Sequence, residues 1–236
     1  TNVTDDYGVL VLAGPKSRDV LSALSDTDLT NEGGFTWMRA KEINVAGIPV
    51  RALRVSYVGE LGWELHCKMG ALQALHNVLI IAGKAHGIRH FGTYAMNSLR
   101  MEKGYKAWGS ELTTEVSPVE AGMIRFARGG GDYLGSQVVT RKKKDGVALH
   151  LVYCEVAAND ADPIGNEPVY ADDTIVGITT SAGYGHYVQK SLLFAYVNSG
   201  FESPGTILKV EILGERKTAK VLGECAWDQA NERLKA

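Results

Sequence analysis

The residue pattern of this chain changes near residue 146, and that change limits the folds it can adopt. Before it, apolar residues at strand spacing alternate with apolar residues at helical spacing. After it come six short apolar stretches, separated by turns such as Asp162-Pro163-Ile164-Gly165-Asn166 and Ser203-Pro204-Gly205. We therefore expect an α+β unit over residues 1–145 and a small β-barrel or sandwich over residues 146–236.

Individual elements can be predicted from the same patterns. Strands are expected over residues 9–12, 37–45, 50–57 and 63–67, and helices after Gly14-Pro15, from 70 to about 85 and from 93 to 103. Ser117-Pro118-Val119-Glu120 has a capping Ser, a Pro at the first helical position and a Glu at capping-box spacing, and so predicts a helix start. Gly129-Gly130-Gly131 predicts a break, Gly183-Tyr184-Gly185 a hairpin turn, and residues 141–146 the end of a short helix. Strands of the second part are expected over residues 147–156, 167–170, 174–181, 192–197, 207–212 and 217–222.

Charge and composition exclude several classes of partner. The 236 residues are 45% apolar and 22% charged, with a net charge of −2, which is ordinary for a globular chain and gives no footprint for nucleic acid or for an anionic membrane surface. No stretch approaches the roughly 18–20 uninterrupted apolar residues of a membrane span. The chain lacks a starting Met and a signal peptide, and we expect it to be a piece of a longer protein.

The cysteines and histidines give no metal or disulfide framework. Cys67, Cys154 and Cys225 are odd in number, far apart and form no CxxC pair, which favours a reducing compartment: the cytoplasm, or the mitochondrial matrix in a eukaryote. His86 and His90 have helical spacing, but Gly87 lies between them and removes a rigid frame for a metal ion. Phosphate-binding, zinc-protease and serine-hydrolase motifs are also missing from the sequence.

The stretch Ser56-Tyr57-Val58-Gly59-Glu60-Leu61-Gly62-Trp63-Glu64-Leu65 carries the most chemical information. Its two glycines allow a tight return of the chain, which brings two strands side by side. Tyr57 would end one strand and Glu64 would lie in the next, so both can face one pocket. A carboxylate accepts two parallel hydrogen bonds from an amidine-type edge while an aromatic ring packs on the heterocycle. An ordinary hairpin with Tyr57 in the core and Glu64 in water remains the alternative.

This stretch resembles the pattern Tyr-x-Gly-Glu-x-Gly-x-Glu of the glycine-cleavage aminomethyltransferase family. The tyrosine and the last glutamate of that pattern, which contact the pterin of tetrahydrofolate, match Tyr57 and Glu64. Four further segments agree in order and spacing: Val11-Leu12-Ala13-Gly14-Pro15-Lys16-Ser17-Arg18, Ser98-Leu99-Arg100-Met101-Glu102-Lys103-Gly104, Ser117-Pro118-Val119-Glu120-Ala121-Gly122 and Gly177-Ile178-Thr179-Thr180-Ser181. The resemblance implies the aminomethyltransferase-like folate-binding fold, a ferredoxin-like α+β unit followed by a small β-barrel, without its N-terminal part.

Other segments are similar to the dimethylglycine and sarcosine dehydrogenase branch of this family. They are Phe91-Gly92-Thr93-Tyr94-Ala95-Met96-Asn97, Gly104-Tyr105-Lys106-Ala107-Trp108-Gly109 and Gln189-Lys190-Ser191-Leu192-Leu193-Phe194-Ala195-Tyr196-Val197. Stand-alone aminomethyltransferases have a folate-contacting Arg where this chain has Met96. An aminomethyltransferase of glycine cleavage and a non-catalytic folate-binding module stay open as alternatives, since a dead pocket would follow if the missing part completes it.

In that branch, an N-terminal FAD-bearing domain oxidises an N-methyl amine, and the folate domain captures the one-carbon unit as 5,10-methylenetetrahydrofolate. The resemblance therefore implies tetrahydrofolate as cofactor, FAD on the missing domain alone, and that flavin domain, in the same or a separate chain, as partner. The family's catalytic aspartate lies well before the Gly-Pro segment, so no residue here matches it; Asp5 and Asp6 lie too close. We expect no catalytic residue and no metal in this chain, which alone would be inactive.

The resemblance and the strand pattern together select the candidate folate-binding residues Tyr57, Glu64, Leu65, His66 and Arg125. His66 shares a strand face with Glu64 because side chains two residues apart point the same way. An Arg at 125 can pair with the glutamate tail of folate. Arg100 and Glu102 are expected to be structural ties, and Trp63 and Trp108 packing residues.

Overall fold

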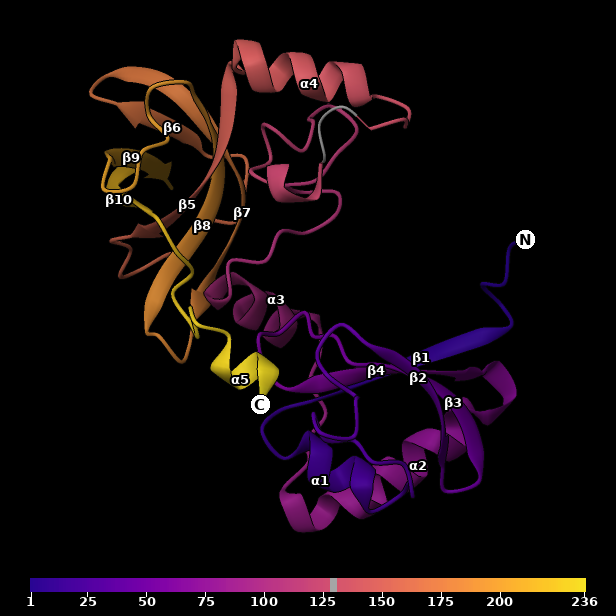
Figure 1. The fold of residues 1–236 in the computed structure, drawn as a ribbon. Coiled ribbons are helices and arrows are strands. Elements are labelled where there is room, and N and C mark those ends of the chain that lie inside the picture. Colours follow the sequence, from indigo (N-terminus) through magenta and orange to yellow (C-terminus); the bar gives the residue numbers. More distant parts are fainter. Residues whose placement is uncertain (128–130) are drawn as a thin grey trace. The chain divides into compact units, whose positions relative to one another are not determined.

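The computed structural model describes residues 1–127 and 131–236 of the chain, and its ribbon is drawn in Figure 1. The chain forms two compact units, called unit 1 (residues 1–96 with 228–236) and unit 2 (residues 97–227). The break predicted at Gly129-Gly130-Gly131 falls partly outside the described residues, because 129 and 130 are among those left out. The division into units falls inside helix α3 (Thr93–Glu102), whereas the change of pattern near residue 146 marks where the barrel strands begin.

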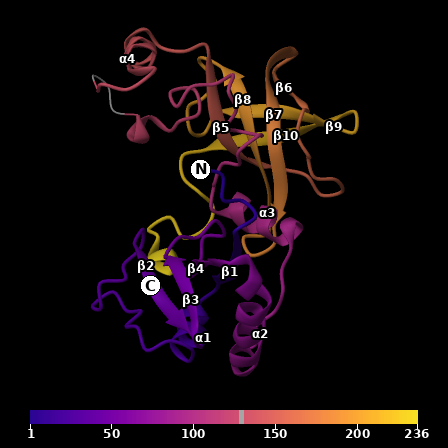
Figure 2. The same ribbon diagram turned by 90° about the vertical axis from the view of Figure 1, so that its right-hand side faces the viewer.

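Unit 1 contains a four-stranded antiparallel sheet. The strands are β1 (Tyr7–Ala13), β2 (Ala40–Val45), β3 (Ile48–Leu53) and β4 (Gly62–Lys68), in the spatial order β1-β4-β3-β2. Its helices are α1 (Ser17–Ser22), α2 (Leu72–Gly83) and the short α5 (Glu232–Lys235), and single 3₁₀ turns precede and follow α2 at Met69–Ala71 and Lys84–His86. In Figures 1 and 2, α1 and α2 lie on the same side of the sheet.

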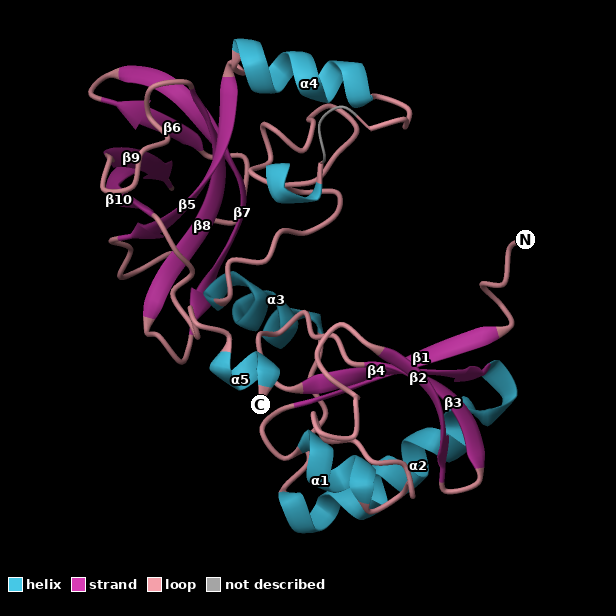
Figure 3. Ribbon diagram, in the orientation of Figure 1, coloured by secondary structure: helices cyan, strands magenta, loops and turns pink. Residues whose placement is uncertain are grey.

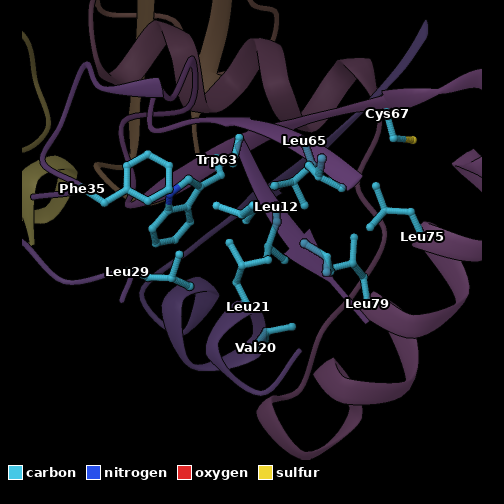
Figure 4. Packing of buried hydrophobic residues seen from close by; sticks show 14 of the residues in the cluster. Leu12, Val20, Leu21, Leu29, Phe35, Trp63, Leu65, Cys67, Leu75 and Leu79 are labelled. Carbon is cyan, nitrogen blue, oxygen red and sulfur yellow. The ribbon is translucent and has the colours of Figure 1, made fainter. Parts of the chain in front are cut away.

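One face of this sheet is buried against α1 and α2. On β4, the side chains of Trp63, Leu65 and Cys67 point into this core, where Figure 4 shows them beside residues of both helices. Glu64 and His66 alternate with them and point to the other face. The core comprises Leu12, Val20, Leu21, Leu29, Phe35, Ile43, Val45, Val50, Ala52, Leu61, Trp63, Leu65, Cys67, Leu75 and Leu79. The packing role predicted for Trp63 is confirmed, since the side chain is fully buried.

Unit 2 is built around a closed six-stranded barrel, drawn with its helices in Figure 3. The strands are β5 (Leu149–Val156), β6 (Pro168–Ala171), β7 (Thr174–Gly185), β8 (Lys190–Asn198), β9 (Ile207–Ile212) and β10 (Glu215–Leu222), in the order β10-β5-β8-β7-β6-β9. All six coincide with strands expected from the sequence. The turn predicted at residues 183–185 is wrong, because these residues finish β7 and pair with β8.

A network of polar side-chain contacts in unit 2 is centred on Arg100 of α3. Its guanidinium donates to the carboxylate of Glu111, the hydroxyl of Ser181 and the carbonyl of Tyr105. Glu102 accepts hydrogen bonds from the main-chain N–H groups of residues 187 and 188. Both α3 side chains are buried, so the expectation that they are structural ties is confirmed. Trp108, by contrast, is 80% exposed, and the packing role predicted for it is wrong.

At the helix start predicted from Ser117, the capping hydrogen bonds form but no α-helix follows. The Ser117 N–H donates to the Glu120 carboxylate at 3.0 Å, and the Val119 N–H donates to the Ser117 hydroxyl at 3.3 Å. The chain then turns at Gly122, whose φ of +63° lies in the left-handed region, and continues into the 3₁₀ turn Ile124–Phe126. A later helix, α4 (Ser136–Asp145), precedes the barrel and ends at Gly146 as the sequence predicts.

Candidate functional site

The outer face of the unit 1 sheet presents Glu64 and His66, each with an apolar neighbour on β1. In the strand register, Glu64 pairs with Val11 of β1 on one side and with Leu53 of β3 on the other. His66 pairs with Val9 and Arg51 in the next row. Directly paired residues of antiparallel strands point to the same face, so Val11 and Leu53 flank the Glu64 carboxylate. We call these two rows the outer-face site.

Glu64 and His66 contact each other within the outer-face site. His66 Nε2 lies 3.2 Å from Glu64 Oε2, and the two side chains are about one-third exposed, at 29% and 36%. An ionised carboxylate only accepts hydrogen bonds, so the ring nitrogen is the donor when Glu64 is charged. One carboxylate oxygen is therefore oriented by the protein while the group stays open to solvent.

The side chains of Tyr57 and Leu65 do not lie where the sequence placed them. β3 ends at Leu53, so Tyr57 lies in the following loop and is half-buried, whereas the sequence placed it at the end of a strand. Leu65 is fully buried in the core, on the sheet face opposite Glu64 and His66. The structure thus brings Glu64 and His66 together on one face of the sheet and puts Leu65 on the other.

Arg125 belongs to unit 2, in the exposed 3₁₀ turn Ile124–Phe126. Its guanidinium lies over the ring of Phe126, 4.7 Å from the centroid. Burial lowers the pKa of Lys106, and the positive charge of Arg125 lowers it further. Two cations of unit 2 therefore influence each other electrostatically.

Three apolar members of the outer-face site were missed in the sequence. Val9, Val11 and Leu53 come from strands that pair with β4 over long sequence distances. The signal available in the sequence was their spacing, since residues two apart in the expected strand 9–12 point to the same face. What the sequence lacked was the identity of the neighbouring strand.

The described residues contain neither a metal-binding cluster nor a membrane-spanning helix. Within residues 1–127 and 131–236, no group of three or more His, Cys, Asp or Glu side chains is arranged to hold a metal ion. None of the helices in that same part of the chain has the length and apolar content needed to cross a membrane.

Comparison with known proteins decides the family. Residues 1–129 match the family described as the GCVT N-terminal domain, and residues 150–228 match the glycine cleavage T-protein C-terminal barrel domain. The chain belongs to the glycine cleavage T-protein family. The second match covers the six barrel strands up to the loop after β10. The resemblance inferred from Tyr57, Glu64 and the four accompanying segments is thereby confirmed.

Among curated relatives in this family, dimethylglycine dehydrogenase of Mus musculus, a mitochondrial protein, is 41% identical over 225 residues, which are 94% of this chain. Mitochondrial sarcosine dehydrogenase of Mus musculus is 30% identical over 241 residues, or 98% of the chain. The chain spans 26% of the length of each of these relatives, at their C-terminal part. An aminomethyltransferase of Geobacillus sp. (strain WCH70) is 30% identical over 97% of the chain, which spans 63% of that protein.

A solved structure confirms the fold of this family member. The glycine cleavage system aminomethyltransferase T from Bartonella henselae superposes with a TM-score of 0.82 at 21% sequence identity, over 94% of this chain and 60% of that one. The predicted α+β unit followed by a small barrel is therefore confirmed as the aminomethyltransferase fold.

Proposed function

We propose that the chain binds tetrahydrofolate at the outer-face site and serves as the folate module of a flavin-dependent dimethylglycine or sarcosine dehydrogenase. The observation that carries the proposal is the Glu64 carboxylate, held by His66 and flanked by Val11 and Leu53 on an otherwise apolar part of a sheet face. A reduced pterin has an amidine-type edge of N–H donors and two flat faces. The Glu64 carboxylate can accept hydrogen bonds from that edge, and the apolar neighbours suit the faces of such a ring.

Each residue has a proposed role. Glu64 accepts hydrogen bonds from the pterin edge, and His66 holds Glu64 in the orientation that this requires. Val11 and Leu53 exclude water on either side of the carboxylate. Tyr57 lies in the loop before β4 and contacts the ring, as the family pattern implies, while Leu65 supports Glu64 and His66 from the core.

From the family resemblance alone, Arg125 is proposed to bind the glutamate tail of folate. The glutamate tail is anionic, and a guanidinium binds a carboxylate through two parallel N–H donors.

Sequence identity favours dimethylglycine dehydrogenase over the aminomethyltransferases, 41% against 30% at similar coverage of this chain, whereas sarcosine dehydrogenase is also 30% identical. The chemistry that tetrahydrofolate supplies is a pair of amine nitrogens that accept a one-carbon unit. FAD is assigned to a part of the dehydrogenase outside these residues, in the same or a separate chain. As no residue here matches the family's catalytic aspartate, residues 1–236 alone should bind folate without turnover.

Isothermal titration with folinic acid, a stable reduced folate, tests the proposal. We expect one saturable site per chain. Glu64→Gln removes the charge and replaces one acceptor by a donor, so the affinity should fall by about a hundredfold, in line with about 2–3 kcal/mol for a charge-assisted hydrogen bond.

Glu42→Gln is the matched control. Glu42 lies on the same sheet face, on β2, and its charge pairs with Arg51 at 2.7 Å. The control should leave the titration unchanged. If Glu64→Gln binds folinic acid as tightly as the unaltered chain, Glu64 has no role in pterin recognition; if neither chain binds, the folate proposal fails for residues 1–236.

A further inference from the structure

We draw no further inference here: the strongest candidate, the apolar cavity of unit 2 between the 3₁₀ turn Ile124–Phe126 and α4, carries nothing because this chain spans only part of the length of its relatives and nothing in the residues that the structure describes shows what covers its lining side chains of Phe126, Leu134 and Val138.

Discussion

Arg100 and Glu111 form an ion pair at 3.1 Å inside unit 2, with side chains 4% and 0% exposed. The second oxygen of Glu111 accepts a hydrogen bond from the Thr180 hydroxyl at 2.7 Å, and the first also accepts from the Ala107 N–H at 2.7 Å. Three parts of the chain, α3, the loop at Ala107 and β7, thus converge on one buried carboxylate. A satisfied network of this kind fixes the position of α3 within the unit more than it adds to net stability.

Arg100→Leu should destabilise the chain strongly. It leaves the Glu111 carboxylate buried without its cation, and the expected loss in the free energy of unfolding is about 3–5 kcal/mol. Urea denaturation measures it. Arg51→Leu is the control, because both side chains of the Arg51–Glu42 pair are exposed. The urea midpoint of this variant should equal that of the unaltered chain. A similar midpoint for both variants would refute the structural role of Arg100.

The free energy of unfolding of unit 2 should depend on pH through the ionisation of Glu120. Burial raises the pKa of this carboxyl, but hydrogen bonds from Lys142 and Ser117 outweigh it and lower the pKa to about 2. Because the pKa of Glu120 is lower in the folded chain than in the unfolded chain, the ionised carboxylate stabilises the fold at pH values above the unfolded pKa. This contribution is lost as the pH falls through the folded pKa. About 1–3 kcal/mol should therefore be present at pH 7 and disappear between about pH 4.5 and 2.

Urea denaturation at several pH values checks this, with Glu120→Gln and Lys142→Met as comparisons. Both variants should be less stable than the unaltered chain at neutral pH, and the difference should vanish towards pH 2. A difference that stays constant with pH would mean that the Glu120–Lys142 contact contributes nothing through the charge of Glu120.

The three cysteines should differ in reactivity. Burial raises the pKa of Cys154 to about 12 and also raises the pKa of Cys67, whereas Cys225 is half-buried. Since the thiolate is the nucleophile, iodoacetamide at pH 8 should modify Cys225 at least about a hundredfold faster than the other two. In urea all three should react alike. Modification of Cys154 in the folded chain at the rate of Cys225 would contradict its burial.

Gly177 should not tolerate a methyl group. A Cβ there would lie 2.3 Å from the carbonyl oxygen of Tyr196 on β8, which is main chain and cannot move without shifting the strand. Gly177→Ala should lower the free energy of unfolding by at least about 2 kcal/mol in urea denaturation. Gly70→Ala, where no atom lies within 4 Å, is the control and should be neutral. Equal stability of the two variants would show that β7 and β8 can separate locally.

Val11→Glu should weaken folate binding. Val11 pairs directly with Glu64, so the variant puts a second carboxylate beside the first and competes for the same N–H donors. Titration with folinic acid should show an affinity lower by about tenfold or more. Val3→Glu, at an exposed residue before the sheet, supplies the same charge and should leave binding unchanged. Unchanged binding for Val11→Glu would place the ligand away from the outer-face site.

The features predicted best from the sequence depend on short-range periodicity. Alternation along residues 63–67 was enough to put Glu64 and His66 on one face and Trp63 in the core, since a strand has a period of two. The barrel strands were found because each lies between turn residues. Pairing was not predicted: the neighbours of Glu64 come from residues 11 and 53, and nothing local specifies which strands meet.

The errors have specific physical causes. At Ser117 the capping bonds form as the sequence suggests, but caps alone do not offset the cost of nucleating a helix, and the left-handed Gly122 ends the turn. Trp108 was expected to pack because a large aromatic side chain usually does, yet its burial depends on distant residues that the sequence pattern does not identify.

Unit 1 is assembled from both ends of the chain, because residues 228–236 belong with residues 1–96. The buried guanidinium of Arg54 donates to the main-chain carbonyls of Lys235 and Ala236. A ribosome therefore finishes the whole of unit 2 before it supplies the last piece of unit 1. During synthesis, the four strands that present Glu64 can therefore pair before the barrel emerges, but the Arg54 guanidinium gains two of its main-chain acceptors only after unit 2 has been made.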